Sequence, residues 1–105
     1  MSTQVKIGQA GEHIVARELA AKGYRTNFDT KGPGSTDIEA RGGAANVLVK
    51  VKTAVAPNAP AGLSSDEERN IKSRAARLGY QAWEAKLQVD SALNVVGAIA
   101  WRQLS

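Results

Sequence analysis

Residues 36–53, TDIEARGGAANVLVKVKT, decide the fold that this chain can adopt. The first six residues alternate in polarity, with the acids Asp37 and Glu39 on one side, and a Gly-rich turn follows them. After the turn the chain alternates again, with valines on one side and Lys50 and Lys52 on the other. Strict alternation is typical of β-strands, because successive side chains point to opposite faces of a sheet. The stretch therefore predicts a hairpin of two antiparallel strands.

The segments on either side of this hairpin predict an α/β fold. Residues 4–22 carry apolar side chains at helical spacing and are followed by a glycine, so we expect a helix there. We expect strands at residues 24–29, 36–41, 46–53, 81–89 and 95–101. We expect a second helix that begins with a capping box at Ser64 or Ser65 and ends before Gly79. The connections are a loop at 31–35, a long loop at 54–63 and a turn at 90–94. The order αβββαββ predicts a mixed central sheet flanked by helices, because the second helix allows a parallel crossover.

Length and composition limit the class of protein. A chain of 105 residues has the size of one domain, so we expect a single domain over residues 1–105. The chain has no cysteine and one histidine, His13, which excludes disulfides and argues against thiolate zinc sites and Ser-His triads. Any chemistry must then use carboxylates, lysines and a hard metal ion.

Charge and hydropathy indicate the partner and the compartment. No apolar run approaches the roughly 20 residues that span a bilayer, and the first residues lack the apolar segment of a signal peptide. We therefore expect a soluble cytoplasmic protein with no membrane partner. A formal net charge of +4 and a pI near 9.7 favour an anionic partner, most often nucleic acid.

Three residues could supply a hydrolytic site. Glu12 lies on the apolar side of the first helix, where an unpaired carboxylate is costly, so we expect it to have a partner. Asp37 follows a Gly-rich loop at the start of a strand, and we expect its side chain to emerge at the sheet edge, outside the packed interior, near Lys52. Phosphodiester hydrolysis without histidine needs carboxylates that hold Mg²⁺ and a cation near the phosphate. The alternative is a solvated face with cross-strand ion pairs, which are common and stabilise little.

Four short motifs resemble a known nuclease core. They are GQAGEHIVAREL at 8–19, GY at 23–24, GSTDIEA at 34–40 and VLVKVKT at 47–53. In order and spacing they resemble the N-terminal part of the PD-(D/E)XK superfamily, most closely its Holliday-junction-resolvase-like and restriction-endonuclease-like branches. The resemblance implies a restriction-endonuclease-like fold and a metal-dependent DNA endonuclease. In such an enzyme Glu12 matches the helix glutamate, Asp37 the central metal ligand and Lys52 the catalytic lysine.

Position 50 departs from that pattern. Where the superfamily has a second acidic ligand this chain has Lys50, which cannot bind a metal ion when charged and would repel one nearby. One hypothesis is that Glu39 replaces the missing ligand, giving the metal ligands Asp37, Glu12 and Glu39. Others are a catalytically inactive DNA-binding module on the same fold, an inactivating substitution, or a protein-interaction domain. We expect Mg²⁺ (or Mn²⁺) to bind weakly if at all.

The expected partner is duplex or branched DNA. The candidate contacts are the cations Lys31, Lys50, Lys52, Arg69 and Lys72. The resemblance also favours a homodimer, since resolvase-like proteins must cut two strands. Trp83 and Trp101 occupy alternating positions in adjacent expected strands, and we expect core or interface residues there rather than base-stacking platforms.

Overall fold

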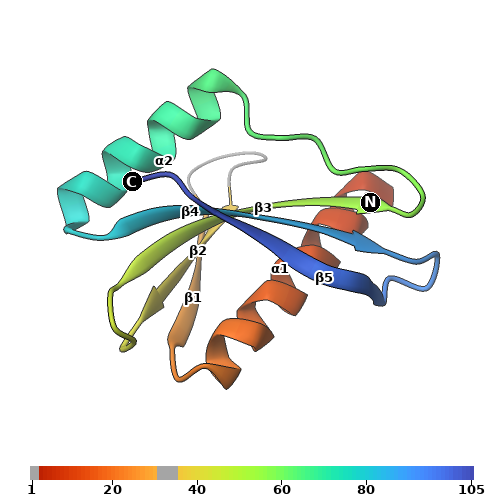
Figure 1. Cartoon of the computed structure of the whole chain (residues 1–105), viewed down its shortest axis with the longest axis horizontal. Helices are drawn as coiled ribbons and strands as arrows, with labels where there is room; N and C mark the ends of the chain where they lie inside the picture. Colours follow the sequence, from red (N-terminus) through yellow and green to blue (C-terminus); the bar gives the residue numbers. More distant parts are fainter. Residues whose placement is uncertain (1–2, 31–35) are drawn as a thin grey trace.

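The computed structural model describes residues 3–30 and 36–105 (Figure 1). The predicted α/β fold and the order αβββαββ are confirmed. The elements are α1 (Thr3–Ala21), β1 (Arg25–Thr30), β2 (Thr36–Arg41), β3 (Val47–Val55), α2 (Ser65–Leu78), β4 (Gln81–Val89) and β5 (Val95–Gln103). The loop expected at 31–35 lies outside the described residues. Strands β3 and β5 continue further than predicted, to Val55 and Gln103 instead of 53 and 101.

The five strands form one mixed sheet in the order β1-β2-β3-β4-β5. Neighbours are antiparallel except for β3 and β4, which run parallel. The parallel pair is the one joined through α2, as the crossover argument predicts. Helices α1 and α2 cover opposite faces of the sheet, as Figure 1 shows. No helix in the described part of the chain is long and apolar enough to cross a membrane.

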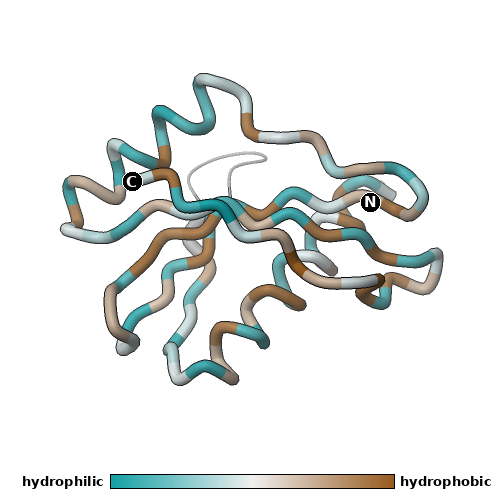
Figure 2. Tube along the Cα trace, viewed as in Figure 1, coloured by the Kyte–Doolittle hydropathy of each residue, from teal (hydrophilic) through white to brown (hydrophobic). Residues whose placement is uncertain are grey.

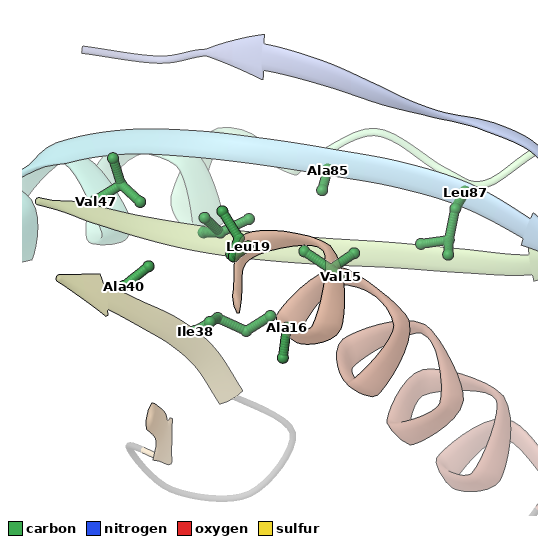
Figure 3. Close-up of a cluster of buried hydrophobic side chains, with 9 residues drawn as sticks. Val15, Ala16, Leu19, Ile38, Ala40, Val47, Ala85 and Leu87 are labelled. Atoms are coloured by element: carbon green, nitrogen blue, oxygen red, sulfur yellow. The ribbon is translucent and has the colours of Figure 1, made fainter. Parts of the chain in front are cut away.

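Helix α1 forms the larger core with the strands. Its inward side chains Val15, Ala16 and Leu19 pack on a floor of apolar strand residues (Figure 3). That floor consists of Ile38, Ala40, Val47, Val49, Ala85 and Leu87. These strand positions share one face of the sheet, because alternate residues of a strand point the same way, and together they make its buried part aliphatic.

Helix α2 forms a smaller core on the other face. Ile71 and Ala75 pack against Leu48 and Ala82, whereas much of the rest of the helix is hydrophilic (Figure 2). The predicted capping box is confirmed at Ser64, whose hydroxyl accepts from the backbone N–H of the third helical residue at 3.1 Å. The helix ends at a glycine with φ of 75°, a left-handed conformation that favours glycine. Few apolar residues hold α2, so its position depends on polar contacts with the sheet.

Gly11 lets α1 approach strand β3 closely. A Cβ atom at this position would collide with the side-chain oxygen of Thr53. Because only glycine lacks a Cβ atom, the sequence here permits a contact that any other residue would obstruct. The close approach holds the next residue, Glu12, beside the C-terminal half of β3.

Candidate functional site

A row of charged residues crosses the sheet on the face that α2 covers. Its members alternate in sign: Asp37 on β2, Lys50 on β3, Glu84 on β4 and Arg102 on β5. Lys50 is the direct partner of Glu84 across β3 and β4, and Glu84 is the direct partner of Arg102 across β4 and β5. Opposite charges on neighbouring strands attract, so each residue of this charged row is attracted to its neighbours on the adjacent strands.

Asp37 lies inside the protein, and the expectation that it emerges outside the packed interior is wrong. The residue is 1% exposed. Helix α2 lies over this part of the sheet, and the Arg74 guanidinium donates a hydrogen bond to Oδ2 of Asp37. The other oxygen, Oδ1, lies 3.7 Å from the Lys50 ammonium, too far for a hydrogen bond but close enough for strong attraction. Two cations therefore neutralise one buried carboxylate.

The expectation that Asp37 lies near Lys52 is also wrong, because of the strand register. Ile38 pairs with Val49 in the antiparallel ladder, which places Asp37 opposite Lys50 rather than Lys52.

Lys52 contacts helix α2 instead. Its ammonium donates to Oε2 of Glu67 at 2.8 Å. The second carboxylate oxygen of Glu67 accepts from the backbone N–H of Ser64 at 2.9 Å, completing the capping box. Burial acts to raise the pKa of Glu67, but the hydrogen bonds from Lys52 and Ser64 outweigh it and lower the pKa below its usual value. One carboxylate thus both caps α2 and fixes Lys52.

Glu84 anchors the segment that leads into α2. The side chain is 1% exposed and accepts from Arg102 Nε and from the backbone N–H of Leu63, each at 3.0 Å. Burial acts to raise its pKa, but these donors together with the nearby positive charges lower it. Because Leu63 immediately precedes the cap of α2, Glu84 ties the start of that helix to the sheet.

A cleft of about 410 Å³ opens beside these ion pairs. Its polar wall is formed by Glu12 from α1, Lys50 and Lys52 from β3, and Glu67 from α2. Burial raises the pKa of Glu12 above its usual value, although the positive charges of Lys50 and His13 act in the opposite direction and Asp37 adds to the rise. Lys50 exerts the strongest attraction on Glu12, but this attraction does not offset the burial of the carboxylate.

The structure separates the predicted DNA contacts. Lys50 and Lys52 line the cleft. Arg69 and Lys72 line a different groove, between α2 and the last residue described, and pair with the α2 acids Asp66 and Glu68. The remaining candidate, Lys31, lies outside the described residues.

The residues present do not fit a divalent metal ion. No group of three or more acidic, histidine or cysteine side chains within residues 3–30 and 36–105 is placed to hold one. Glu39 does not line the cleft and lies 3.9 Å from Arg41, so it does not complete a ligand set with Glu12 and Asp37. Asp37 itself is already neutralised by Lys50 and Arg74.

Sequence reasoning missed the roles of Arg74 and Glu84 and the contact of Glu67 with Lys52, although it predicted the capping box to which Glu67 belongs. The signal for two of them is present: Glu67 lies four residues before Ile71 and Arg74 three after it, so both share the sheet-facing side of α2. Because α2 carries several other cations, the sequence alone does not single out Arg74. Glu84 has no such signal, because a glutamate in an alternating strand usually faces solvent.

Comparison with known proteins identifies the fold. No protein-family model and no curated protein sequence matches the chain. The structure resembles that of Hjc, a Holliday junction resolvase from the archaeal hyperthermophile Archaeoglobus fulgidus, with a TM-score of 0.69 and 20% identity. The match covers 92% of this chain and 72% of that chain. The chain has a resolvase-like fold. The fold that the sequence motifs implied is thereby confirmed.

Proposed function

We propose that this protein binds DNA in the cleft of its resolvase-like fold and does so without a divalent metal ion. The observation that carries the proposal is the buried carboxylate of Asp37, neutralised by Lys50 and Arg74. Around the cleft three acids, Glu12, Asp37 and Glu67, face three cations, Lys50, Lys52 and Arg74. A metal site carries surplus negative charge that repels phosphate until the metal binds, whereas this balanced cluster does not.

The overall charge supports the same proposal. The chain carries a formal net charge of +4, so the long-range field attracts a polyanion. Hydrolysis of a phosphodiester needs a group that activates water and stabilises the charge on phosphorus, and in a cleft with no histidine that group is normally a metal ion. The protein therefore binds DNA and does not hydrolyse it.

A metal-dependent endonuclease is the second candidate. Glu12 and Lys52 do line one cleft, as the resemblance to PD-(D/E)XK nucleases requires. Lys50 weighs against this activity, because its ammonium lies beside the carboxylate that would have to bind the metal.

Salt dependence and one matched pair of variants test DNA binding in the cleft. Lys52 and Lys72 each pair with a glutamate of α2, but only Lys52 lines the cleft. We expect fluorescence anisotropy with labelled DNA in EDTA, with no divalent ion present, to show binding and a steep negative slope of log affinity against log monovalent salt. Each phosphate that the protein no longer neutralises makes this slope shallower by about 0.9. Lys52→Gln should weaken binding and Lys72→Gln should not.

If Lys72→Gln weakens binding and Lys52→Gln does not, the DNA binds in the groove between α2 and Ser105 instead of the cleft. Absence of salt-sensitive binding to every duplex and branched DNA would exclude the proposed function altogether.

Nicking of supercoiled plasmid distinguishes the two candidate functions. The unmodified protein should not nick plasmid in Mg²⁺, whereas Lys50→Glu should gain Mg²⁺ affinity, measured by calorimetry, and nicking. Adding Asp37→Ala to that variant should remove both gains, with circular dichroism confirming that each variant is folded. If the unmodified protein nicks as fast as Lys50→Glu, and Asp37→Ala alone abolishes the activity, the endonuclease is the correct function.

A further inference from the structure

A second cavity, of about 300 Å³, lies on the opposite face of the sheet from the charged row. Three aromatic side chains line it, Tyr24, Trp83 and Trp101, over an aliphatic floor that includes Leu19. All three pack against the core under α1, as expected for Trp83 and Trp101, so the fold holds their positions, and the ring surface that the core leaves uncovered lines the cavity. We call this cavity the ring pocket. Its volume lies at the lower end of the range for small-ligand sites, which suits one ring system and not an extended peptide.

The two tryptophans form a rigid corner of the ring pocket. Their ring centroids are 6.4 Å apart and their planes meet at 81°, an edge-to-face pair. Trp83 is further fixed because its indole N–H donates to Oε1 of Gln81 at 3.0 Å. Pre-formed aromatic walls can stack on a planar guest without reorganising, which favours binding.

Positive charge lies at the rim of the ring pocket. The Lys22 ammonium lies 5.4 Å from the centroid of a Trp101 ring. The guest that suits this pocket is therefore planar, aromatic and attached to an anion.

We propose that the ring pocket receives one unstacked base of bound DNA, with Lys22 contacting the adjoining phosphate. Aromatic side chains stack on any base, because every base presents a π-face. The pocket and the cleft are joined by α1: Glu12 lines the cleft and Leu19 the pocket, about 10 Å apart along the helix at seven residue rises. This inference rests on the proposed function, because the base belongs to DNA that the protein binds.

Tryptophan fluorescence reports on this pocket alone, because Trp83 and Trp101 are the only two tryptophans of the chain. The probes are a DNA duplex with one extrahelical base and a fully paired duplex of the same length. We expect the first to quench the emission saturably and the second to quench it much less. Trp101→Leu should weaken binding of the bulged duplex about tenfold and leave the paired duplex unaffected.

Two controls keep the result interpretable if Trp101→Leu does not fold. Lys22→Gln leaves the aromatic walls in place and should also weaken only the bulged duplex. Tyr80→Leu removes an aromatic ring that packs against the other core and should change neither affinity.

The outcomes separate this inference from the proposed function. Salt-sensitive DNA binding by anisotropy with equal quenching by both duplexes, or with none, overturns the ring pocket and leaves DNA binding intact. Failure to bind any DNA overturns the proposed function and with it the source of the base. A change of emission with protein concentration alone means that a second copy fills the pocket, which also overturns the inference.

Discussion

The two faces of the sheet are built from alternate residues of the same strands, yet they bury opposite kinds of side chain. Under α1 the fully buried strand residues of the core are aliphatic, such as Ile38 and Val49. Under α2 the strands also bury the charges Asp37, Lys50 and Glu84, beside the apolar Leu48 and Ala82. Burial of apolar groups stabilises a fold directly, whereas burial of charge is costly unless every charge has a partner.

This difference separates the positions whose residues stability explains from those whose residues stability does not explain. An aliphatic row in place of the charged row would pack at least as well, because buried ion pairs seldom exceed hydrophobic residues in stability. The charges lie beside the cleft, where a phosphate could meet them. The comparison therefore assigns the buried aliphatic residues under α1 to structure and the buried charges under α2 to chemistry, and three predictions test that assignment.

The largest effect is expected from Asp37→Asn. The substitution removes the buried negative charge that faces Lys50 and Arg74, and breaking such a pair costs about 3–5 kcal/mol. Urea unfolding monitored by circular dichroism measures the change. Asp66→Asn is the control: it breaks an exposed pair with Arg69 on the outside of α2 and should cost less than about 1 kcal/mol.

Equal, small losses for the two aspartates would show that Asp37 is as dispensable as a surface residue. The charged row would then be no part of the packed interior, and the contrast between the two faces would disappear.

The sequence predicted the elements better than their contacts. Alternation and helical spacing depend on neighbouring residues, which is why the hairpin at 36–53 and the capping box of α2 were predicted correctly. The burial of Asp37 depends on Arg74, which is 37 residues away in the chain, and on how far α2 reaches over β2. Such long-range placement has no local signal. The predicted nearness of Asp37 to Lys52 failed for a similar reason, because a register shift of two residues decides which lysine faces it.

An intermediate effect is expected from Gly11→Ala. A Cβ atom would collide with the side chain of Thr53, so α1 must shift from β3 at a cost of about 1–3 kcal/mol. Gly8→Ala is the matched control on the same helix, because its Cβ meets nothing within 4 Å and alanine favours a helix by up to about 1 kcal/mol. The pair should therefore change the free energy of unfolding in opposite directions. If both substitutions stabilise, the close approach of α1 does not position Glu12.

The smallest effect concerns Glu12, which belongs to the helix of the aliphatic face but lines the cleft of the charged one. Burial raises its pKa above the usual 4.5 despite the nearby charge of Lys50. A folded state that holds this proton more tightly loses stability as pH rises from the unfolded pKa to the folded one, and the loss is then constant at higher pH.

The Glu12→Gln variant lacks that loss, because its side chain does not titrate. The free energy of unfolding of the variant minus that of the unmodified protein should therefore increase as pH rises through this window, by less than the effect of Gly11→Ala. Urea unfolding of both proteins from below the usual glutamate pKa to neutral pH measures the difference. A decrease over the same window would mean that attraction to Lys50 exceeds the cost of burial, and Glu12 would then be a full member of the ion-paired cluster.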